Sequence, residues 1–563
     1  MIKYLFLALS FCAWGADEDL VLTQIQKSKN MTDVNKIVKE IIVNDDHKSS
    51  IRSIEKYLQA QNLSTMRAMP KMLIFADLAK FLKVMSLSDE VSPEFILWLS
   101  ESTRRTDLIY SITPNDNLGE VLAILTKLHK HDPKEITKFW KLALAMSLVW
   151  DDEKKLMHHQ MGKDLLPYSW QIVELYDYFK ELYTRGAKVS YSKLSIQDLV
   201  FVVGVNVPLE ELHWARKNCS GSAKSWAKRY FEIKYNHVRL NASRYRWDQG
   251  IYSLANIKEL GGICVDQAYY TVISARANGI PAMYFSGMGR GSTTTGHAWA
   301  GVMKDGKAWD LEIGRYSQGN YGVGKARDPQ TNQRLTDHQL DFKSNPLFTS
   351  DKYKQSLKIT SLAKYFLKMG KEDCAEYLYK KSLSYSKMNL KTYAGLKTIY
   401  SKKESPSQLI QVMKLEMTAF KKYDDFVYEL GTALVDTLNK AGKASEAKSL
   451  QKSLVRKVED RYDLAESATQ NMVKSLYENG KAKEGRRAFE RYIDDQPDFY
   501  NTLNSDLKLY YDLTKEHDQL KYTVRFLKDM MKGSRDRQAV VQDYLYKAYM
   551  DVGDERNAKK LLD

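Results

Sequence analysis

Three side chains of types that cooperate in acyl transfer follow one another in the middle of the chain: Cys264, His297 and Asp310. Cys264 stands at the head of "CVDQAYYTVISARA", whose apolar spacing predicts a helix that ends at Gly279 and Pro281. A thiol at a helix N-terminus meets unpaired N–H groups and the positive end of the helix dipole, and both favour the thiolate. We therefore expect a nucleophile here, with the two preceding glycines giving a substrate carbonyl room to approach.

The base that such a thiol needs is expected at His297, in the strand-like run "TTTGHAWAGV". Alternation along a strand places His297 and Trp299 on one face, and Ala298, Ala300 and Val302 on the other. The small and apolar face would pack inward. We therefore expect the imidazole to be open to a cleft.

The next run, "GKAWDLEIGRY", carries two carboxylates on one face, Asp310 and Glu312. A hairpin that returns through "KDGK" would bring a carboxylate beside His297. There it would hold the tautomer of the ring and stabilise the imidazolium.

Together, "GGICVDQA", "RANGIPA", "GHAW" and "WDLEIGR" resemble the transglutaminase-like superfamily. The resemblance runs from 261 to 316 and rests on four motifs in the family's order: a Gly-x-Cys helix, an Arg-x-x-Gly-Ile-Pro-Ala exit, a Gly-His-Ala-Trp strand and a Trp-led strand with Asp. It implies a papain-like α+β fold and acyl transfer through a Cys-His-Asp triad. It also implies that no cofactor and no metal are needed.

Carried over residue by residue, the resemblance makes Cys264 the nucleophile and His297 the base that becomes the acid. Asp310 would orient the histidine. Family members commonly place this acid a few residues beyond the tryptophan, whereas Asp310 follows Trp309 directly, so Glu312 is a rival for the role.

The oxyanion of such a reaction needs hydrogen-bond donors. The backbone N–H of Cys264 is one candidate. A side chain from upstream, Gln249 or Trp247, is the candidate for a second donor.

Helical periodicity precedes this region, in stretches such as "KMLIFADLAKFLKVM" and "YSWQIVELYDYFKELYTRG". We expect an α-helical N-terminal domain over 16–222, in which "DLVFVVGVNV" carries the strongest strand signal. The adjacent histidines of "MHHQM", at 157–161, would point to different helix faces. We interpret them as surface or capping residues rather than zinc ligands.

The middle of the chain, 223–345, combines one clear helix with short β-type runs such as "IPAMYFSGM" and "HAWAGVMKDG". This composition predicts the α+β core. A loop rich in Gly, Ser and Thr, 286–296, comes directly before His297 and is expected to shape access to the cleft.

The sequence is helical again over 350–563 and repeats the pattern Gly-[Lys/Asp]-x-x-x-[Ala/Gly] at Gly370, Gly442, Gly480 and Gly553. These positions fit a unit of about 36 residues with degenerate copies near 406 and 517, and they resemble tetratricopeptide-like helix-turn-helix repeats. The predicted fold class is therefore multidomain: an α-helical N-terminal region, a transglutaminase-like core and a C-terminal α-helical repeat solenoid.

The first 15 residues, "MIKYLFLALSFCAWG", have one lysine, a short apolar run and small residues at the end, which is typical of a secretory signal peptide. No later stretch offers 18 uninterrupted apolar residues, so we expect an exported protein, periplasmic or extracellular, without a transmembrane segment. Cys219, Cys264 and Cys374 then remain, an odd number that leaves at least one thiol free or paired between chains. The sequence leaves open whether Cys219 and Cys374 form a disulfide bond.

The net charge is +16, from 86 Lys+Arg and 70 Asp+Glu. The charges mostly alternate in sign along helical faces, which is typical of a solvated basic surface. Without an RNA- or DNA-binding motif, and behind a signal peptide, the charge does not predict a nucleic-acid partner.

Two hypotheses of function follow. The first is an exported cysteine enzyme that acts on a peptide or protein substrate through a thioester. Hydrolysis is favoured because exported members of the superfamily often look like peptidases. The second is a non-catalytic or degenerate scaffold whose helical repeats bind a protein or an anionic cell-envelope partner.

Overall fold

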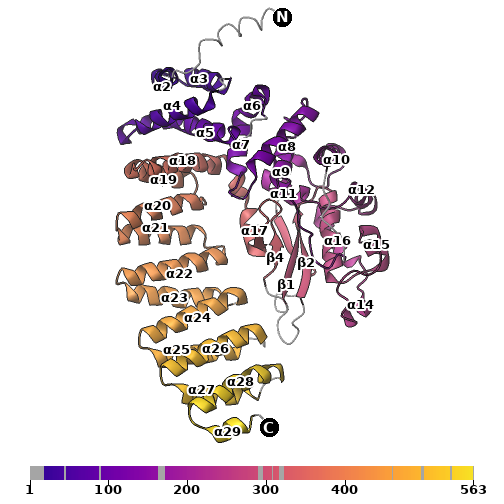
Figure 1. Cartoon of the computed structure of the whole chain (residues 1–563), viewed down its shortest axis with the longest axis vertical. Helices are drawn as coiled ribbons and strands as arrows, with labels where there is room; N and C mark the ends of the chain where they lie inside the picture. The colour runs from indigo at the N-terminus through magenta and orange to yellow at the C-terminus, as the bar shows by residue number, and fades with distance from the viewer. Residues whose placement is uncertain are drawn as a thin grey trace, which may run out of the picture.

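The computed structural model describes residues 18–28, 30–43, 46–87, 91–162, 171–288, 296–306, 308–315, 323–459, 461–495, 500–532 and 535–561. The expected signal peptide and most of the loop 286–296 lie outside the described residues. Figure 1 shows a helical N-terminal region, a central sheet with helices beside it, and a stack of helices that ends at the C-terminus. The fold class predicted from the sequence is confirmed.

The described secondary structure of the N-terminal region is helical, and its helices pack around one apolar core. Its α-helices are α2 (Glu18–Lys27), α3 (Met31–Val43), α4 (His47–Gln59), α5 (Met69–Met85), α6 (Pro93–Leu99), α7 (Ser102–Ser111), α8 (Leu118–His131), α9 (Trp140–Val149), α10 (Ile172–Arg185), α11 (Ile196–Val203) and α12 (Leu209–Asn218). The β-branched run in "DLVFVVGVNV" forms α11 because Ser195 and Asp198 make a reciprocal capping box at its start.

The central region builds a five-stranded antiparallel sheet of order β3-β2-β1-β4-β5. The strands are β1 (Ala282–Met288), β2 (Gly296–Lys304), β3 (Ala308–Ile313), β4 (Lys325–Arg327) and β5 (Arg334–Thr336). The helices of this region are α13 (Lys228–Phe231), α14 (His237–Asn241), α15 (Leu254–Leu260), α16 (Cys264–Ala277) and α17 (Asp337–Lys343).

Helix α16 is the buried centre of this region. All of its residues except Val265 are buried, so it has no polar face. It packs against β1 and β2 on one side and against α11, α12, α13 and α15 on the others. The helix is therefore held between the sheet and helices of both the N-terminal and the central region.

The C-terminal helices form successive antiparallel pairs that stack next to the central region (Figure 1). They are α18 (Asp351–Lys368), α19 (Glu372–Tyr385), α20 (Leu390–Lys402), α21 (Pro406–Ala419), α22 (Asp424–Lys440), α23 (Ala444–Lys457), α24 (Tyr462–Glu478), α25 (Ala482–Asp495), α26 (Tyr500–Glu516), α27 (Leu520–Met530), α28 (Arg535–Asp551) and α29 (Glu555–Lys559). The helical repeats expected from the sequence fit this arrangement.

The turn glycines of the repeat lie where the sequence pattern places them, between the two helices of a pair. Gly370, Gly442, Gly480 and Gly553 have φ between +70° and +77°. The next residue donates its N–H to a carbonyl five positions back, as from Lys371 to Phe366, which is the Schellman closure of a helix. The degenerate copies close in the same way, with Glu404 and Asp518 at positive φ.

Candidate active site

Cys264 is the first residue of α16, and its position depends on the two glycines before it. Gly261 has φ +75°, and a Cβ there would lie 2.4 Å from the carbonyl oxygen of Lys234. A Cβ on Gly262 would lie equally close to Asp266. The glycines therefore give room to the protein's own backbone and to a capping side chain, whereas the sequence suggested room for a substrate.

Cys264 is buried, with 7% of the residue exposed. Burial raises its pKa above the ordinary value of 9.0, and a hydrogen bond from the backbone N–H of Ala298 acts in the opposite direction. The helix N-terminus alone therefore does not make this cysteine a thiolate at neutral pH. The contact with Ala298 places Sγ beside β2, one residue from His297.

The ring of His297 is buried, with 6% of the residue exposed. Its Nε2 lies 2.6 Å from the carbonyl oxygen of Gly314. A carbonyl oxygen only accepts, so Nε2 carries the proton and Nδ1 is the acceptor nitrogen of the neutral ring. Burial lowers the pKa of His297 below 6.5, although the bond to Gly314 raises it, so the ring is neutral at pH 7.

Gly314 can approach the histidine because it has no side chain. Its φ is +85°, and a Cβ on it would lie 2.2 Å from Cζ of Tyr230. The Tyr230 hydroxyl donates to the carbonyl oxygen of Ala298 at 2.9 Å. Tyr230 thus contacts both Gly314, which binds His297, and Ala298, which contacts the thiol of Cys264.

The structure does not bring Asp310 to His297. In the β2–β3 hairpin Asp310 is opposite Val302, five residues beyond His297, which is about 16 Å along a strand. Its carboxylate lies 2.8 Å from Nζ of Lys304. The turn at 305–306 precedes β3 in this register, and the residue that accepts from Nε2 of His297 comes from beyond the end of β3: it is Gly314.

The rival carboxylate, Glu312, pairs with Arg315 at 2.7 Å. Arg315 also binds Asp337 at 2.9 Å, and its guanidinium lies 5.0 Å from the ring of Trp299. The Arg315 guanidinium therefore lies over Trp299, which shares a face of β2 with His297, and His297 itself is only 6% exposed. The alternation of the strand therefore does not leave an open side, and the imidazole is more enclosed than the sequence predicted.

A buried ion pair anchors the start of α16, and sequence reasoning missed its cation. Asp266 accepts from the N–H of Ile263 at 2.8 Å, which caps the helix, and its other oxygen accepts from the Tyr252 hydroxyl at 3.1 Å. Nη1 of Arg239 lies 2.6 Å from the same carboxylate, and both residues are at most 1% exposed. The acid in the first helical turn was a visible signal, but Arg239 stands in a stretch without a pattern.

His158 is part of the same buried cluster, contrary to the expectation of a surface or capping histidine. Its Nε2 lies 2.9 Å from the Tyr252 hydroxyl, and its ring stacks on Tyr284 at 5.4 Å. Burial lowers the pKa of His158 to about 3, so the ring stays neutral. His159, the next residue, is exposed. Within the described ranges, no three His, Cys, Asp or Glu residues are grouped so that they could hold a metal ion.

The two candidate oxyanion side chains have different surroundings. The indole N–H of Trp247 donates to the carbonyl oxygen of Gly250 at 3.0 Å. Nε2 of Gln249 is buried and has no hydrogen-bond partner in the described part of the protein. A buried donor without a partner is unusual. The amide of Gln249 can therefore donate to an oxyanion, whereas the indole N–H of Trp247 already donates to Gly250.

The remaining cysteines lie away from this site. Cys219 and Cys374 are buried free thiols, like Cys264. Sγ of Cys219 lies 3.2 Å from the hydroxyl of Tyr270, and burial raises its pKa. Of the helices that the structure describes, none has the length and apolar character to span a membrane.

Comparison with curated proteins gives no match to this protein. Residues 217–310 match the family model Transglut_core, described as the transglutaminase-like superfamily. The match includes all of α16 and β2 and the first half of β3, and ends before Gly314. The central part of this protein therefore resembles the transglutaminase-like superfamily, a family of cysteine enzymes of acyl transfer.

Proposed function

We propose that this protein is an exported cysteine enzyme that hydrolyses an amide or peptide bond through a thioester on Cys264. The observation that supports it most directly is the state of His297. Its Nε2–H donates to the carbonyl oxygen of Gly314, which makes Nδ1 the basic nitrogen of the neutral ring, and the backbone N–H of its neighbour Ala298 is hydrogen-bonded to the thiol. A neutral base together with a protonated thiol is the starting state of general-base catalysis.

In the proposed reaction, Nδ1 of His297 takes the thiol proton while Sγ attacks the carbonyl carbon. The product is a tetrahedral oxyanion next to an imidazolium. The imidazolium then gives its proton to the leaving amine as the C–N bond breaks, and a thioester remains. Water, deprotonated by the same ring, attacks the thioester and releases the acid and the thiol.

The backbone N–H of Cys264 and Nε2 of Gln249 are the proposed donors to the oxyanion. Both are consistent with the requirement that such donors be fixed before the charge develops. Gln249 is favoured over Trp247 because only its donor lacks a partner among the described residues.

The second candidate function, a degenerate scaffold, is supported by the burial of both Cys264 and His297, at 7% and 6% exposure. A protein of this kind would keep the α+β core and use its helical repeats to bind a partner. It would not acylate its cysteine, so one experiment separates the two candidates.

The experiment uses p-nitrophenyl acetate as a general acyl donor and follows the burst of p-nitrophenol. We expect one burst equivalent per active molecule, and none for Cys264→Ala. Because His297 has a pKa below 6.5, the burst rate of the natural protein should be flat from pH 7 to 9. In His297→Gln the rate should follow the thiolate fraction and rise about tenfold per pH unit, since the thiol pKa is above 9.0.

An Asp310→Asn variant distinguishes the two ways to hold the ring. The pH profile should stay flat, because Lys304 rather than His297 binds this carboxylate. A sloped profile in Asp310→Asn would assign the orienting role to Asp310 instead. Absence of a burst in the natural protein at every pH would favour the scaffold. Added hydroxylamine reports the acceptor, since it speeds turnover only when an amine can reach the thioester.

A further inference from the structure

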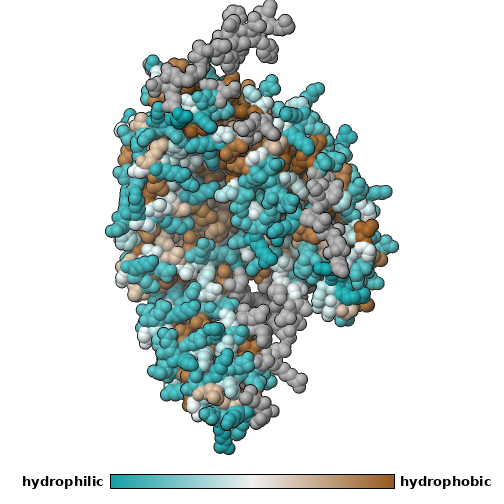
Figure 2. Space-filling view, in the orientation of Figure 1, coloured by the Kyte–Doolittle hydropathy of each residue, from teal (hydrophilic) through white to brown (hydrophobic). Residues whose placement is uncertain are grey.

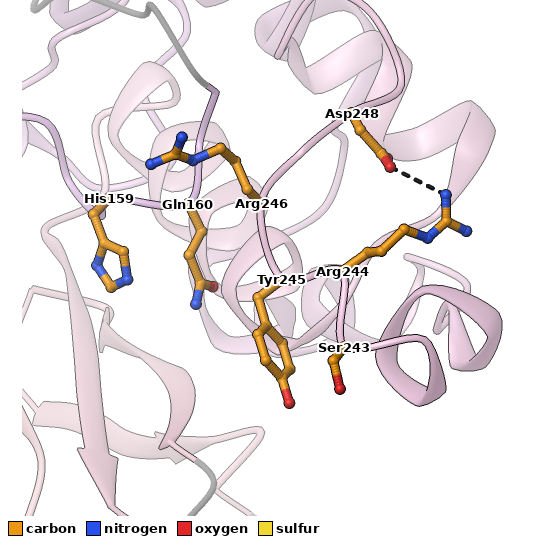
Figure 3. Close-up of a pocket in the computed structure, with 7 residues that line it drawn as sticks. All are labelled: His159, Gln160, Ser243, Arg244, Tyr245, Arg246 and Asp248. Atoms are coloured by element: carbon orange, nitrogen blue, oxygen red, sulfur yellow. Dashed lines mark hydrogen bonds and ion pairs between the residues drawn. The ribbon is translucent and has the colours of Figure 1, made fainter.

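A pocket of about 480 Å³ lies between residues 159–160 and the segment that precedes α15. None of its lining residues takes part in the reaction proposed above. It is lined by Asp248 and by residues of two segments, 159–160 and 243–246. The segments are joined where the N–H of Trp247 donates to the carbonyl oxygen of Gln160 at 2.9 Å. Figure 3 shows these residues around the cavity.

The charges of this pocket do not balance. Arg244 pairs with Asp248 at 3.1 Å, and Figure 3 shows this pair on one side of the cavity. Arg246 extends to the other side, toward His159 and Gln160 (Figure 3), and it makes no ion pair within the described part of the protein. The lining therefore holds two guanidinium groups and one carboxylate, and the second guanidinium suits an anion.

The pocket also offers a hydrogen-bond acceptor. Oε1 of Gln160 is buried and has no partner among the described residues. A ligand that satisfies it must carry a hydrogen-bond donor, such as a peptide N–H, as well as the anion that Arg246 suits. Tyr245, 40% exposed, adds an aromatic ring for the rest of the ligand. A peptide with a carboxylate combines these features.

One buried guanidinium connects this pocket to the nucleophile. Nε of Arg239 donates to the carbonyl oxygen of Arg244 at 2.9 Å, and Nη2 donates to that of Tyr245 at 2.7 Å. Nη1 of the same guanidinium binds Asp266 in the first turn of α16. The wall of the pocket and the turn that begins at Cys264 are thus fixed to a single cation.

We infer that this pocket binds a carboxylate of the peptide substrate through Arg246, while a nearby amide of the same substrate lies at Cys264. The inference rests on the proposed function and names the substrate class: peptides that carry a carboxylate close to the bond that is cleaved. The carboxylate is that of a peptide C-terminus or of an Asp or Glu residue.

The test measures binding to the Cys264→Ala variant, so that no turnover interferes. The probes are two pairs of dansyl peptides: Ala-Ala-Ala with a free or an amidated C-terminus, and Ala-Glu-Ala-amide with Ala-Gln-Ala-amide. We expect one carboxylate peptide to bind about tenfold more tightly than its neutral twin, and the preferred pair identifies the source of the carboxylate. Arg246→Gln should abolish the preference.

Arg487→Gln is the matched control, since it removes the same charge from an exposed position on α25. It should keep the preference. Equal affinities within both pairs, including no measurable binding of any peptide, would overturn the inference, as would an equal loss in Arg487→Gln. An acyl burst without a carboxylate preference would contradict only the inference that the pocket binds a carboxylate. A carboxylate preference without a burst would contradict only the proposed enzymatic function.

Discussion

Gly314 occupies the place at His297 that a carboxylate holds in a Cys-His-Asp triad. It supplies a backbone carbonyl, which fixes the tautomer but brings no negative charge to stabilise an imidazolium. This position admits only glycine, because of its φ of +85° and the Tyr230 ring against it. The base of this site therefore depends on the backbone conformation just after β3.

A Gly314→Ala substitution tests this dependence. We expect it to lower the free energy of unfolding by about 2 to 5 kcal/mol, from backbone strain and from overlap with Tyr230. The p-nitrophenol burst should fall at least about tenfold, since the carbonyl must move away from Nε2. Urea denaturation followed by tryptophan fluorescence and the burst assay measure the two effects.

Gly370→Ala is the control for the backbone effect. This glycine has φ +74° but no atom within 4 Å of an added Cβ, so only the strain of about 1 to 2 kcal/mol should appear. Its burst should be unchanged. A Gly314→Ala variant with natural stability and a full burst would show that the carbonyl does not position His297.

At the residue scale, the sequence predicted those positions that depend only on local secondary structure. The thiol at the head of a helix and the histidine at the start of a strand follow from spacing alone, and the structure places them on α16 and β2. The partner of the histidine does not follow. Asp310 was expected because it shares a hairpin with His297, but the register of that hairpin sets it opposite Val302. A backbone carbonyl has no signature in the residue types.

At the scale of elements, the first turn of α16 is held by a buried ion pair rather than by packing alone. Asp266 caps the helix and binds Arg239, and both are out of contact with solvent. Loss of one partner leaves the other as an uncompensated buried charge, which costs about 3 to 5 kcal/mol.

Asp266→Asn should therefore destabilise the protein by about this amount and loosen the turn that carries Cys264. We expect iodoacetamide to label Cys264 faster, because its burial is lost, while the acyl burst becomes smaller. These opposite changes separate a positioning role from a simple loss of fold. Peptide mass spectrometry after timed labelling gives the first rate.

Glu312→Gln is the matched control for Asp266→Asn. It also removes a carboxylate from an arginine, but Glu312 has 45% of its side chain exposed and Arg315 keeps Asp337. Its cost should stay below about 1 kcal/mol. If Asp266→Asn were no more destabilising than this control, the ion pair would not be the anchor of α16.

Elements were predictable where glycine and periodicity mark them. The turn glycines of the repeat indicated the helix pairs, since a Schellman closure needs a residue at positive φ. The same reasoning failed at α11, where β-branched residues favoured a strand and a capping box favoured a helix. Burial on several sides removes the amphipathic pattern that would have decided between them.

At the scale of the whole molecule, the first helix pair of the solenoid docks on the N-terminal helices. Lys354 and Lys358 of α18 bind Asp107 and Asp77 of the N-terminal helices at 3.1 and 3.5 Å. Tyr365 donates to Glu55. These partners are more than 240 residues apart in the sequence, so no local pattern could predict the docking. Figure 2 shows hydrophilic residues over most of the visible face, in keeping with the net charge of +16.

The distal part of the solenoid has an apolar core of its own, so we expect it to unfold as a separate unit. One apolar core extends from the N-terminal helices through the sheet and into the first helices of the solenoid, whereas the helices from α24 onward pack around a core of their own. All ten tryptophans precede residue 350. Tryptophan fluorescence therefore reports on the proximal part, and far-ultraviolet circular dichroism reports on the distal helices as well.

Asp506, inside this distal core, makes its stability depend on pH. It is 2% exposed, accepts from Gln470 at 2.9 Å and lies near Glu466. Burial raises the pKa of Asp506 from 3.8 to about 7, and the charge of Glu466 adds to the effect. Because the folded pKa is the higher one, the contribution to stability is full below about pH 4, is lost as the pH rises to about 7, and then stays constant.

We therefore expect the distal helices to lose up to about 4 kcal/mol between pH 4 and pH 8. At pH 8, urea should reduce the circular dichroism before it changes the tryptophan emission, and at pH 5 the two transitions should lie closer together. Asp506→Asn removes the titrating group and keeps an oxygen for Gln470, so its two transitions should keep the same separation at both pH values. If the separation in the natural protein did not change with pH, Asp506 would not be the group that titrates. If Asp506→Asn kept the natural pH dependence, another carboxyl of this core, Glu466 first, would carry it.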